Sequence, residues 1–337
     1  MAAQPASDSS DAAPHADPDA LRLFYEERYS GAYMAEHPGV AAERVREVLS
    51  TIPASGVESI LDYGCGRGFW TPILHETFPA AAVTGIDISE TAIERARAAF
   101  PTATFSTFDG RRAPYPDAAF SLVFSFHVLE HVLDLTQTLD DIARLVAPRG
   151  SACLILPCGN EGSFEHTIAR LTNALTTSPT GEMRFRFEDE GHLRRLRSTE
   201  LIALLRRRNL ELVSASFANH RWGAIEFIAK SDPAFIRRFA AAGSAARPFD
   251  RWRIVLTRTF LLMLSQIVRA HRVARKGTTA AQGAKAAVAR LLRPVEPILA
   301  PIVRAVERRS AREWSERRHD PRGSAQYLVL RRADPSL

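Results

Sequence analysis

The sequence predicts an α/β fold in which helices cover both faces of a mostly parallel sheet. Short apolar runs typical of strands alternate with longer stretches typical of helices between residues 58 and 217. This alternation favours parallel strands that are joined by helical crossovers. A glycine-rich loop follows the first run, and an acidic residue ends the second. A strand that leads through glycines into a helix is typical of α/β folds that hold a nucleotide-like ligand.

The pattern of apolar residues predicts where the strands and helices lie. Strands are expected at 58–62, 82–86, 103–106, 120–125, 151–156, 211–217 and 325–330. Helices of the core are expected at 40–49, 71–78, 90–100, 133–146 and 199–208. Because the last strand lies far along the chain from the sixth, residues 219–322 are expected to be an insertion between them.

Three glycines alternate with other residues directly after the first predicted strand. They are Gly64, Gly66 and Gly68, in the string D-Y-G-C-G-R-G that begins at Asp62. Glycine permits close approaches of the backbone that a side chain would block. Two alternatives are a plain structural loop and the dinucleotide fingerprint G-x-G-x-x-G, whose spacing is one residue longer. The second predicted strand ends in Asp87, where an acid can accept hydrogen bonds from both hydroxyls of a ribose.

Taken in order, these motifs resemble those of the class I S-adenosylmethionine-dependent methyltransferases. The string at 62–68 is followed by G-I-D-I-S at 85–89 and by F-D-G at 108–110. The resemblance extends over residues 25–217 and the strand predicted near the C-terminus. It implies a Rossmann-like sheet of seven strands with an antiparallel seventh strand, S-adenosylmethionine as the cofactor, and an enzyme that transfers a methyl group.

The resemblance assigns the glycine loop to the methionine part of the cofactor. The residues expected to border that part are Gly64, Cys65, Gly66 and Gly68. A side chain at the glycines would collide with the cofactor. Asp62, at the end of the strand, resembles the family acid that interacts with the methionine ammonium group.

The next two motifs are assigned to the ribose and the adenine in the same way. Asp87 is expected to hold the ribose hydroxyls, and Ile88 to lie against the adenine ring. Asp109 resembles the acid that accepts a hydrogen bond from the adenine amino group, with Phe108 and Gly110 beside it. An alternative role for Asp109 is that of a turn residue before the glycine.

A histidine-rich segment follows the fourth predicted strand. Phe126 and His127 are expected to border the cofactor where the methyl group is delivered. His127, Glu130 and His131 have the i, i+3 and i+4 spacing of one helical face, and such a set could bind a metal. It resembles E-x-x-E-H of the quinone O-methyltransferases, but His127 replaces the first acid. The prediction is that no metal is bound.

A third histidine is a candidate for the acceptor side of the site. His192 stands in the string G-H-L-R-R-L, which resembles a family string that reaches the acceptor. Because the pKa of a histidine lies near neutrality, it could deprotonate an acceptor hydroxyl. Its alternative role is to cap the following helix. The catalytic candidates are His127, His131 and His192, although alignment of the reactants alone could suffice for methyl transfer.

Charge is distributed unevenly along the chain. Residues 1–218 carry 20 Lys and Arg against 29 Asp and Glu, whereas residues 219–337 carry 24 against 9. The basic C-terminal third is therefore expected to meet a different partner from the acidic body. The 3 cysteines lack the spacing of a zinc site or a disulfide framework. Without a signal peptide or an apolar run of about 20 residues, a cytoplasmic protein is expected.

The two ends of the chain differ in composition. Residues 1–19 are rich in Ala, Pro, Ser and Asp and are expected to be a disordered tail. Residues 20–50 are expected to form an N-terminal helical cap, in which Tyr25, Tyr29 and Tyr33 share one face. These tyrosines either pack on the core or, with residues 25–34, form a lid over the cofactor. The catalytic core is then expected at 51–218 and 323–337.

The insertion at 219–322 has an amphipathic character. Residues 251–272 predict a helix with a wide apolar face and an arginine edge formed by Arg251, Arg258, Ser265, Arg269 and Arg272. Such a helix lies on an anionic membrane, closes over an apolar pocket, or packs on the core with its arginines in solvent. The stretch 291–306 contains three prolines and is not expected to be one straight helix. Residues 304–318 are expected to be exposed.

The sequence therefore predicts an S-adenosylmethionine-dependent methyltransferase. The expected acceptor is a hydroxyl of a hydrophobic or lipid-linked small molecule or glycan. The insertion also suggests that the protein lies at the inner face of the membrane as a peripheral protein. An N- or RNA-methyltransferase is the alternative enzyme. In the insertion of this chain the arginines accompany aliphatic residues and not the aromatic residues that stack on bases. Nucleic acid is therefore not the expected partner. A non-catalytic cofactor-binding interaction module is the third alternative.

Overall fold

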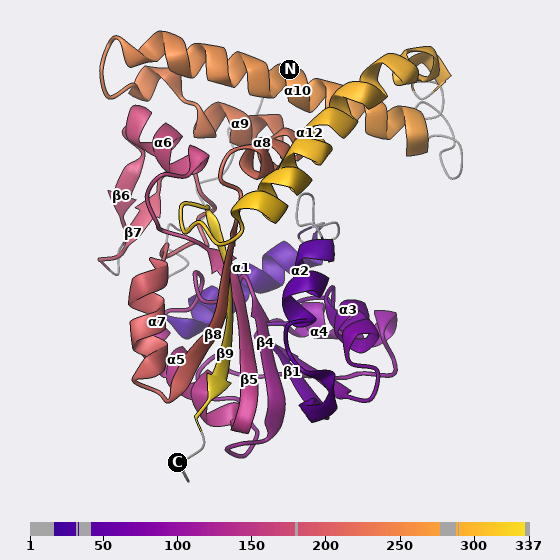
Figure 1. Cartoon of the computed structure of the whole chain (residues 1–337), viewed down its shortest axis with the longest axis vertical. Helices are drawn as coiled ribbons and strands as arrows, with labels where there is room; N and C mark the ends of the chain where they lie inside the picture. The colour runs from indigo at the N-terminus through magenta and orange to yellow at the C-terminus, as the bar shows by residue number, and fades with distance from the viewer. Residues whose placement is uncertain are drawn as a thin grey trace, which may run out of the picture.

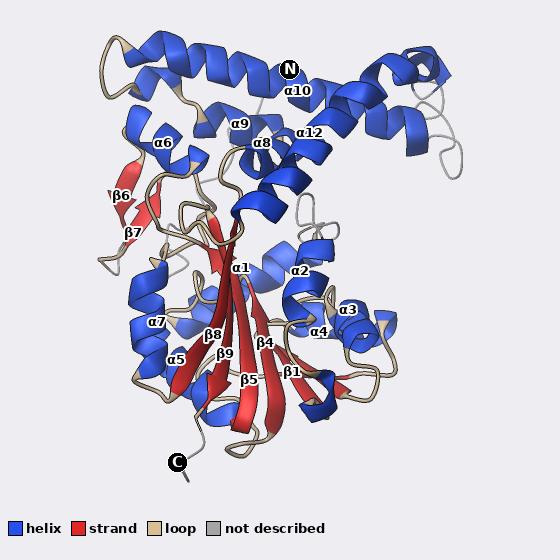
Figure 2. Cartoon of the chain, in the orientation of Figure 1, coloured by secondary structure: helices blue, strands red, loops and turns tan. Residues whose placement is uncertain are grey.

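A seven-stranded sheet forms the centre of the computed structural model, which describes residues 17–31, 33, 42–178, 181–276, 288 and 290–333 (Figures 1 and 2). Its strands are β1 (Ser59–Tyr63), β2 (Ala82–Asp87), β3 (Thr104–Thr107), β4 (Phe120–Phe126), β5 (Val146–Pro157), β8 (Leu210–Ala218) and β9 (Ala325–Arg332). They lie in the order β3-β2-β1-β4-β5-β9-β8. β9 runs antiparallel to both its neighbours, and the other pairs are parallel. The predicted fold is confirmed.

Helices cover both faces of the sheet because successive strand residues point to opposite sides. Ile60 of β1 packs with side chains of α2 (Ala42–Leu49) and α3 (Thr71–Thr77). Its neighbour Leu61 packs on the other side with α5 (Leu135–Leu145) and α7 (Ser198–Arg206). Both residues are fully buried, as expected for a central parallel strand.

The last strand returns to the sheet after a long excursion. β9 lies between β5 and β8, so that Leu330 pairs with Ala152 on one side and with Leu212 on the other. The chain leaves the sheet after Ala218 and re-enters it at Ala325. Residues 219–322 thus lie between two neighbouring strands, which is the arrangement expected for an insertion. The boundaries predicted for the domains remain a prediction.

Four helices of this segment, called the helical layer below, lie beyond the carboxyl ends of the parallel strands (Figure 1). They are α8 (Trp222–Lys230), α9 (Pro233–Phe239), α10 (Asp250–Lys276) and α12 (Glu296–Arg317). Their core includes Ile228, Phe239, Leu261 and Val303. Beside them lie α6 (Phe164–Leu171) and the hairpin of β6 (Leu175–Thr177) and β7 (Met183–Phe185).

A buried carboxylate ties the helical layer together. Glu313 of α12 accepts hydrogen bonds from the backbone N–H groups of Arg221, Trp222 and Gly223 at 3.0, 2.7 and 3.0 Å. These N–H groups stand at the start of α8, where a negative charge stabilises a helix by up to about 2 kcal/mol. The next residue, Trp314, packs edge-on against Tyr327 of β9. The layer is therefore anchored to the sheet.

The structure confirms one expectation for the C-terminal helices and corrects another. The stretch 291–306 is not one straight helix, because a 3₁₀ turn at Arg293–Val295 interrupts it, although α12 then runs through Pro301 without a break. Val306 and Trp314 are buried, so residues 304–318 are not simply exposed. Tertiary packing of these side chains outweighs the hydrogen bond that a proline removes from a helix.

Other elements were not predicted, or fall partly outside the described residues. α6, β6, β7, α8 and α9 are short, and contacts distant in sequence stabilise them. The helix α1 (Pro18–Ser30) begins inside the predicted tail, α4 (Glu90–Ala99) follows β2 as expected, and no part of 1–16 is described. The predicted lid extends to residue 34 and the predicted core to residue 337, and both of these ends lie outside the described residues.

Candidate functional site

A cavity of about 480 Å³ opens at the carboxyl ends of β1, β2 and β4, beneath the helical layer. The chain order reverses between β1 and β4, since β2 and β3 lie on one side of β1 and β4 on the other. Such a switch point is where open α/β sheets bind ligands. The volume lies within the usual range for small-molecule sites, about 300–1,000 Å³.

The glycine loop forms one wall of the cavity. Gly64 and Gly66 line it with φ angles of +77° and +52°. A Cβ atom at Gly64 would stand 2.3 Å from Val128, and one at Gly66 would stand 2.8 Å from the hydroxyl oxygen of Tyr29. Both the backbone conformation and the close neighbours therefore require glycine. Cys65 between them is buried and also lines the cavity.

Gly68 is placed differently from the other two glycines. It is not among the residues that line the cavity, and a Cβ atom there would stand 2.9 Å from Phe100. Its φ angle is +73°. Gly68 thus lets the loop pack onto the hydrophobic cluster around Phe105, and its predicted contact with the cofactor stays a prediction.

Asp87 lines the cavity and holds the glycine loop in place. One carboxylate oxygen accepts a hydrogen bond from the Gly66 N–H at 2.8 Å, and the other accepts from the Ser89 N–H at 3.0 Å. Burial raises the pKa of Asp87 to about 6, although these hydrogen bonds act to lower it. Each oxygen retains a second lone pair, which is what acceptance from a ribose hydroxyl would need.

Asp62 is buried beside this loop without a hydrogen-bond donor for either oxygen among the described residues. It does not itself line the cavity. Burial, with the nearby charge of Asp87, raises the pKa of Asp62 to about 8. A buried carboxylate without donors is costly unless a cation lies near it. A carboxylate in this state fits the predicted role beside the ammonium group of S-adenosylmethionine.

The residues predicted for the adenine lie together on the far wall. Ile88, Phe108, Asp109 and Gly110 all line the cavity. Phe108 packs edge-on against Tyr63, with ring centroids 5.4 Å apart. The exposed carboxylate of Asp109 accepts a hydrogen bond from the N–H of Arg111 at 2.9 Å, so its alternative role in a turn is real. Its predicted contact with the adenine remains a prediction.

Three tyrosines of the N-terminal segment cover the cavity. Tyr25, Tyr29 and Tyr33 all line it, and Tyr25 and Tyr29 are buried. Arg28, on the same segment, makes a paired hydrogen bond and ion pair with Asp189, at 2.5 Å for each nitrogen–oxygen contact. The segment 17–33 is therefore held across the opening, which is the arrangement that a lid requires.

His127 and Glu130 form a pair at the end of β4. The His127 Nδ1 lies 2.7 Å from a carboxylate oxygen of Glu130. His127 has a φ angle of +54°, which is unusual for a residue with a side chain and is a conformation that often marks a functional site. Next to it, the predicted Phe126 lines the cavity and packs on Trp70. The predicted helical face is wrong, since turns follow His127.

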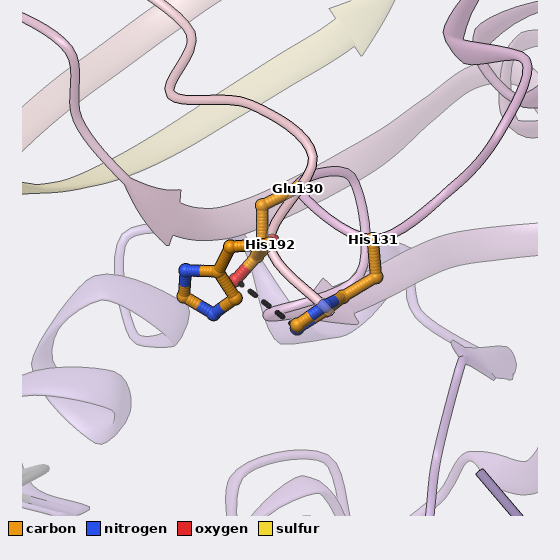
Figure 3. Close-up of side chains that lie close together, drawn as sticks. All are labelled: Glu130, His131 and His192. Atoms are coloured by element: carbon orange, nitrogen blue, oxygen red, sulfur yellow. Dashed lines mark ion pairs between the residues drawn. The ribbon is translucent and has the colours of Figure 1, made fainter. Parts of the chain in front are cut away.

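Glu130 is a buried carboxylate among histidines. Burial acts to raise its pKa, but His127 above all, with His131 and His192, holds the pKa of Glu130 at about 2. Glu130, His131 and His192 offer ligand atoms within 4.8 Å of one another and could together hold a metal ion (Figure 3). This set differs from the predicted one, because His192 takes the place of His127. The absence of a metal remains a prediction.

His131 and His192 pack edge-on, with ring centroids 4.6 Å apart. The His131 Nδ1 lies 2.8 Å from the carbonyl oxygen of Gly191 and 2.7 Å from the Tyr25 hydroxyl. Because a carbonyl only accepts, Nδ1 carries the proton and Nε2 faces Glu130, 3.9 Å away (Figure 3). Burial lowers the pKa of His131 to about 4, so its ring is neutral near pH 7.

His192 does not cap the next helix, since Arg197 stands at the N-cap position of α7. Its Nδ1 lies 3.3 Å from a carboxylate oxygen of Glu188. Burial acts to lower the pKa of His192, but the hydrogen bond and the charge of Glu188 raise it above the ordinary value. His192 lines the cavity together with His127 and His131, so the structure brings the three predicted catalytic histidines to one site.

The part of the cavity under the helical layer, called the layer end, was not predicted from the sequence. Its walls include Phe187, Phe227 of α8, and Phe235 and Arg238 of α9. The buried guanidinium of Arg195 supports this wall through ion pairs of 2.5 Å with Glu188 and 2.7 Å with Glu165. Only the string that contains His192 pointed toward this region. The aromatic residues carry no local motif.

Comparisons with known proteins agree with this geometry. The family model for a methyltransferase domain matches residues 33–215. The trans-aconitate 2-methyltransferases of Shigella dysenteriae serotype 1 and Escherichia coli O6:H1 are each 37% identical over 120 residues, which make up 35% of this chain and 47% of theirs. The chain thus spans about half the length of the curated relatives that it matches.

Two solved structures are similar in fold. The [4+2]-cyclase SpnF is 18% identical with a TM-score of 0.48, and the alignment covers 93% of this chain and 92% of that one. A putative methyltransferase from Bacillus halodurans C-125 is 12% identical with a TM-score of 0.48, covering 86% of this chain and 99% of that one.

Proposed function

The chain belongs to the methyltransferase domain family, and we propose that it transfers the methyl group of S-adenosylmethionine to an oxygen atom of a largely apolar acceptor. One observation carries the proposal: His127, which contacts the buried carboxylate of Glu130, lines the same cavity as the glycine loop and the aromatic side chains of the layer end. The cofactor, when bound, supplies a methyl group on a positively charged sulfur, which is already activated for attack.

The residues of the glycine loop and its neighbours would hold the cofactor. Gly64 and Gly66 leave room for it, Asp87 would accept from the ribose, and Asp62 would face the ammonium group. Ile88 and Asp109 would border the adenine. Asp87 also anchors the loop, so it would position the backbone as well as bind the ribose.

His127 would act as the general base. The Nδ1 of His127 lies 2.7 Å from a carboxylate oxygen of Glu130, and in a neutral ring that carries its proton on Nδ1, Nε2 is the nitrogen that accepts. A hydroxyl is a weak nucleophile until it loses its proton, and a positioned base contributes about 10²–10⁴-fold to such a step. His127 would take the proton from the acceptor oxygen as that oxygen displaces S-adenosylhomocysteine as the leaving group, and Glu130 would stabilise the charge that the ring gains.

The aromatic residues of the layer end favour an apolar acceptor. Phe187, Phe227 and Phe235 lie in its wall, and Arg238 is exposed at the same end. Small-molecule sites are lined mainly by apolar side chains with few polar groups that fix the orientation of the ligand. Phe187 packs edge-on against Phe235, so the wall is a continuous aromatic surface.

Methyl-labelled cofactor tests the proposal. The full chain would be incubated with labelled S-adenosylmethionine and either a lipid extract, a series of long-chain alkylphenols, or trans-aconitate. We expect label in a product that partitions into organic solvent and resists mild alkali, as an ether does. Label released by alkali as methanol would identify an ester and overturn the hydroxyl assignment. Binding of the cofactor without any transfer would overturn the enzyme assignment.

A carboxylate is the second candidate acceptor. The matched relatives are named for transfer to trans-aconitate, and Arg238 offers a cation at the layer end. A carboxylate is ionised at neutral pH and needs no base. Replacing His127 would then slow the reaction little, which separates this candidate from the first.

A further inference from the structure

Two neighbouring helices of the helical layer expose large apolar side chains on the outside of the molecule. On α10 and directly before it these are Phe249, Trp252, Leu256, Phe260 and Met263, which are between 48% and 72% exposed. Their spacing of three or four residues places them on one helical face. They form the first half of what is called the outer apolar surface below.

The second half lies on the N-terminal part of α12 and the turn before it. Leu291, Val295, Ile298 and Ile302 are between 39% and 78% exposed, again at spacings of three and four residues. α10 and α12 pack against each other (Figure 1). Of the 15 exposed large hydrophobic residues among the described ones, 11 lie between residues 249 and 302. Such a concentration marks an interaction surface, whereas single exposed residues do not.

The outer apolar surface is distinct from the face by which α10 joins the protein. Ile254, Leu261, Leu264 and Val268 form that inner face and are between 0% and 6% exposed. Ser265, which belongs to the predicted arginine edge, is fully buried. The helix thus has two apolar faces, and the prediction of one wide face with a solvated edge is corrected. Packing on the core explains only the inner face.

The charge around this surface identifies its partner. Of the described residues between 250 and 309, 12 are Lys or Arg and 3 are Asp or Glu. We propose that the outer apolar surface lies on a membrane that contains anionic lipids. Aromatic and aliphatic side chains would enter the boundary between headgroups and acyl chains, and the arginines would pair with lipid phosphates. A second copy of the chain fits less well, because its equally basic surface would repel the first.

The helix α10 would lie in the plane of such a membrane. It has 27 residues, so its axis is about 40 Å long at a rise of 1.5 Å per residue. None of the described helices is both long and apolar enough to cross a bilayer. An in-plane position lets one side of α10 contact lipid while Ile254 and Leu261 keep their contacts with the protein.

This surface and the cavity belong to the same helical layer. Phe227 of α8 and Phe235 of α9 line the cavity, and both pack with residues of α10 in one hydrophobic cluster. The membrane would therefore touch the layer that closes the acceptor side of the cavity. The binding of lipid itself does not depend on the proposed reaction, and its test uses no turnover.

Flotation with vesicles of defined composition tests the inference. Full-length protein at physiological salt would be mixed with vesicles of phosphatidylcholine alone or with 30% phosphatidylglycerol, and bound protein measured after centrifugation. We expect binding to the anionic vesicles and little to the neutral ones. Trp252→Glu with Phe260→Glu should weaken binding about tenfold or more, because an acid replaces each aromatic anchor. Replacing Arg253, which flanks this face of α10 and is half exposed, by Gln should weaken it about fivefold.

A matched control separates this surface from exposed apolar residues in general. Val213 of β8 is 52% exposed, the same fraction as Trp252, and lies on the sheet. Val213→Glu should bind vesicles as the unchanged protein does, and thermal unfolding should show that all variants are folded. Equal binding by the Trp252/Phe260 variant would overturn the proposal. A second outcome would also overturn it: the unchanged protein is a dimer in size-exclusion chromatography and does not bind vesicles, and the Trp252/Phe260 variant is a monomer.

Discussion

The two ends of the cavity are built in different ways. The cofactor end consists of loops that follow β1, β2 and β3, so its residues lie between positions 62 and 110. The layer end brings together residues between 165 and 327, from α6, α8, α9 and β9 among others. The matched family model ends at residue 215, before α8 begins. The cofactor end thus lies within the part that the family model matches, whereas α8, α9 and β9 of the layer end lie beyond it.

Because the two ends differ in this way, binding of the cofactor and binding of the acceptor should depend on different residues. Backbone groups and two buried acids form the cofactor end, and Asp87 fixes the shape of its loop through the Gly66 N–H. Aromatic side chains form most of the layer end. Changes at one end should therefore leave ligand binding at the other unchanged, except at His127 and Glu130, which stand between the two.

The largest effect is expected where the two ends meet. Glu130→Gln should lower kcat by about 10²–10³-fold, because a neutral amide does not stabilise the positive charge that His127 gains. The affinity for S-adenosylhomocysteine, measured by calorimetry, should remain within about twofold of the unchanged protein. His75→Gln on α3 provides a control histidine outside the cavity. An unchanged kcat would favour a carboxylate acceptor or transfer by alignment alone.

The next effect concerns the cofactor end and pH. Asp62 has a pKa of about 8 in the structure, so it is mostly protonated below that pH and ionised above it. Only the ionised form attracts an ammonium group, so affinity for S-adenosylmethionine should rise about tenfold between pH 6 and pH 7.5. Calorimetry across this range measures it. Asp62→Asn should remove the pH dependence, and a flat profile in the unchanged protein would place Asp62 away from the ammonium group.

A smaller effect is expected at the layer end. Phe235→Ala should raise the KM for the acceptor about tenfold through lost apolar contact, while the affinity for S-adenosylmethionine stays the same. Steady-state kinetics with the acceptor found in the labelling experiment measures the KM. Calorimetry measures the affinity for S-adenosylmethionine. Val213→Ala serves as an exposed apolar control. Loss of cofactor binding in Phe235→Ala would show that the two ends do not bind their ligands independently.

The segment over the cofactor end should contribute less still. Arg28→Gln removes the ion pair with Asp189 that holds the segment in place. Both side chains are partly exposed, so solvent weakens the pair, and such pairs contribute about 1 kcal/mol or less. We expect release of S-adenosylhomocysteine to become up to about fivefold faster in stopped-flow measurements. An unchanged rate would show that the segment does not limit release.

No effect is expected from a chelator. The Nδ1 atoms of His131 and His192 already contact Gly191 and Glu188, and Glu130 contacts His127. Methyl transfer after dialysis against EDTA should therefore equal that of the untreated protein. A loss of activity that a divalent ion restores would instead make Glu130, His131 and His192 a metal site.

The amino-acid sequence by itself determined the sheet and the cofactor end. Alternating apolar runs predicted all seven strands, because a buried parallel strand is recognisable from its own residues. The glycine loop and Asp87 were predictable for the same reason, since their geometry depends on neighbours in the chain. Gly68 shows what such a motif leaves open: the resemblance assigned it to the cofactor, and only the structure shows that an added Cβ atom there would meet Phe100.

Only the tertiary structure decided how distant residues meet. The contact of His131 with His192 joins two loops 61 positions apart in the chain, and the φ angle of +54° at His127 replaces the helical turn that the spacing predicted. Periodicity shows which side chains of α10 share a face. It does not say whether that face meets the protein or the exterior, because the answer depends on what packs against it: Leu261 is buried and Phe260 beside it is exposed.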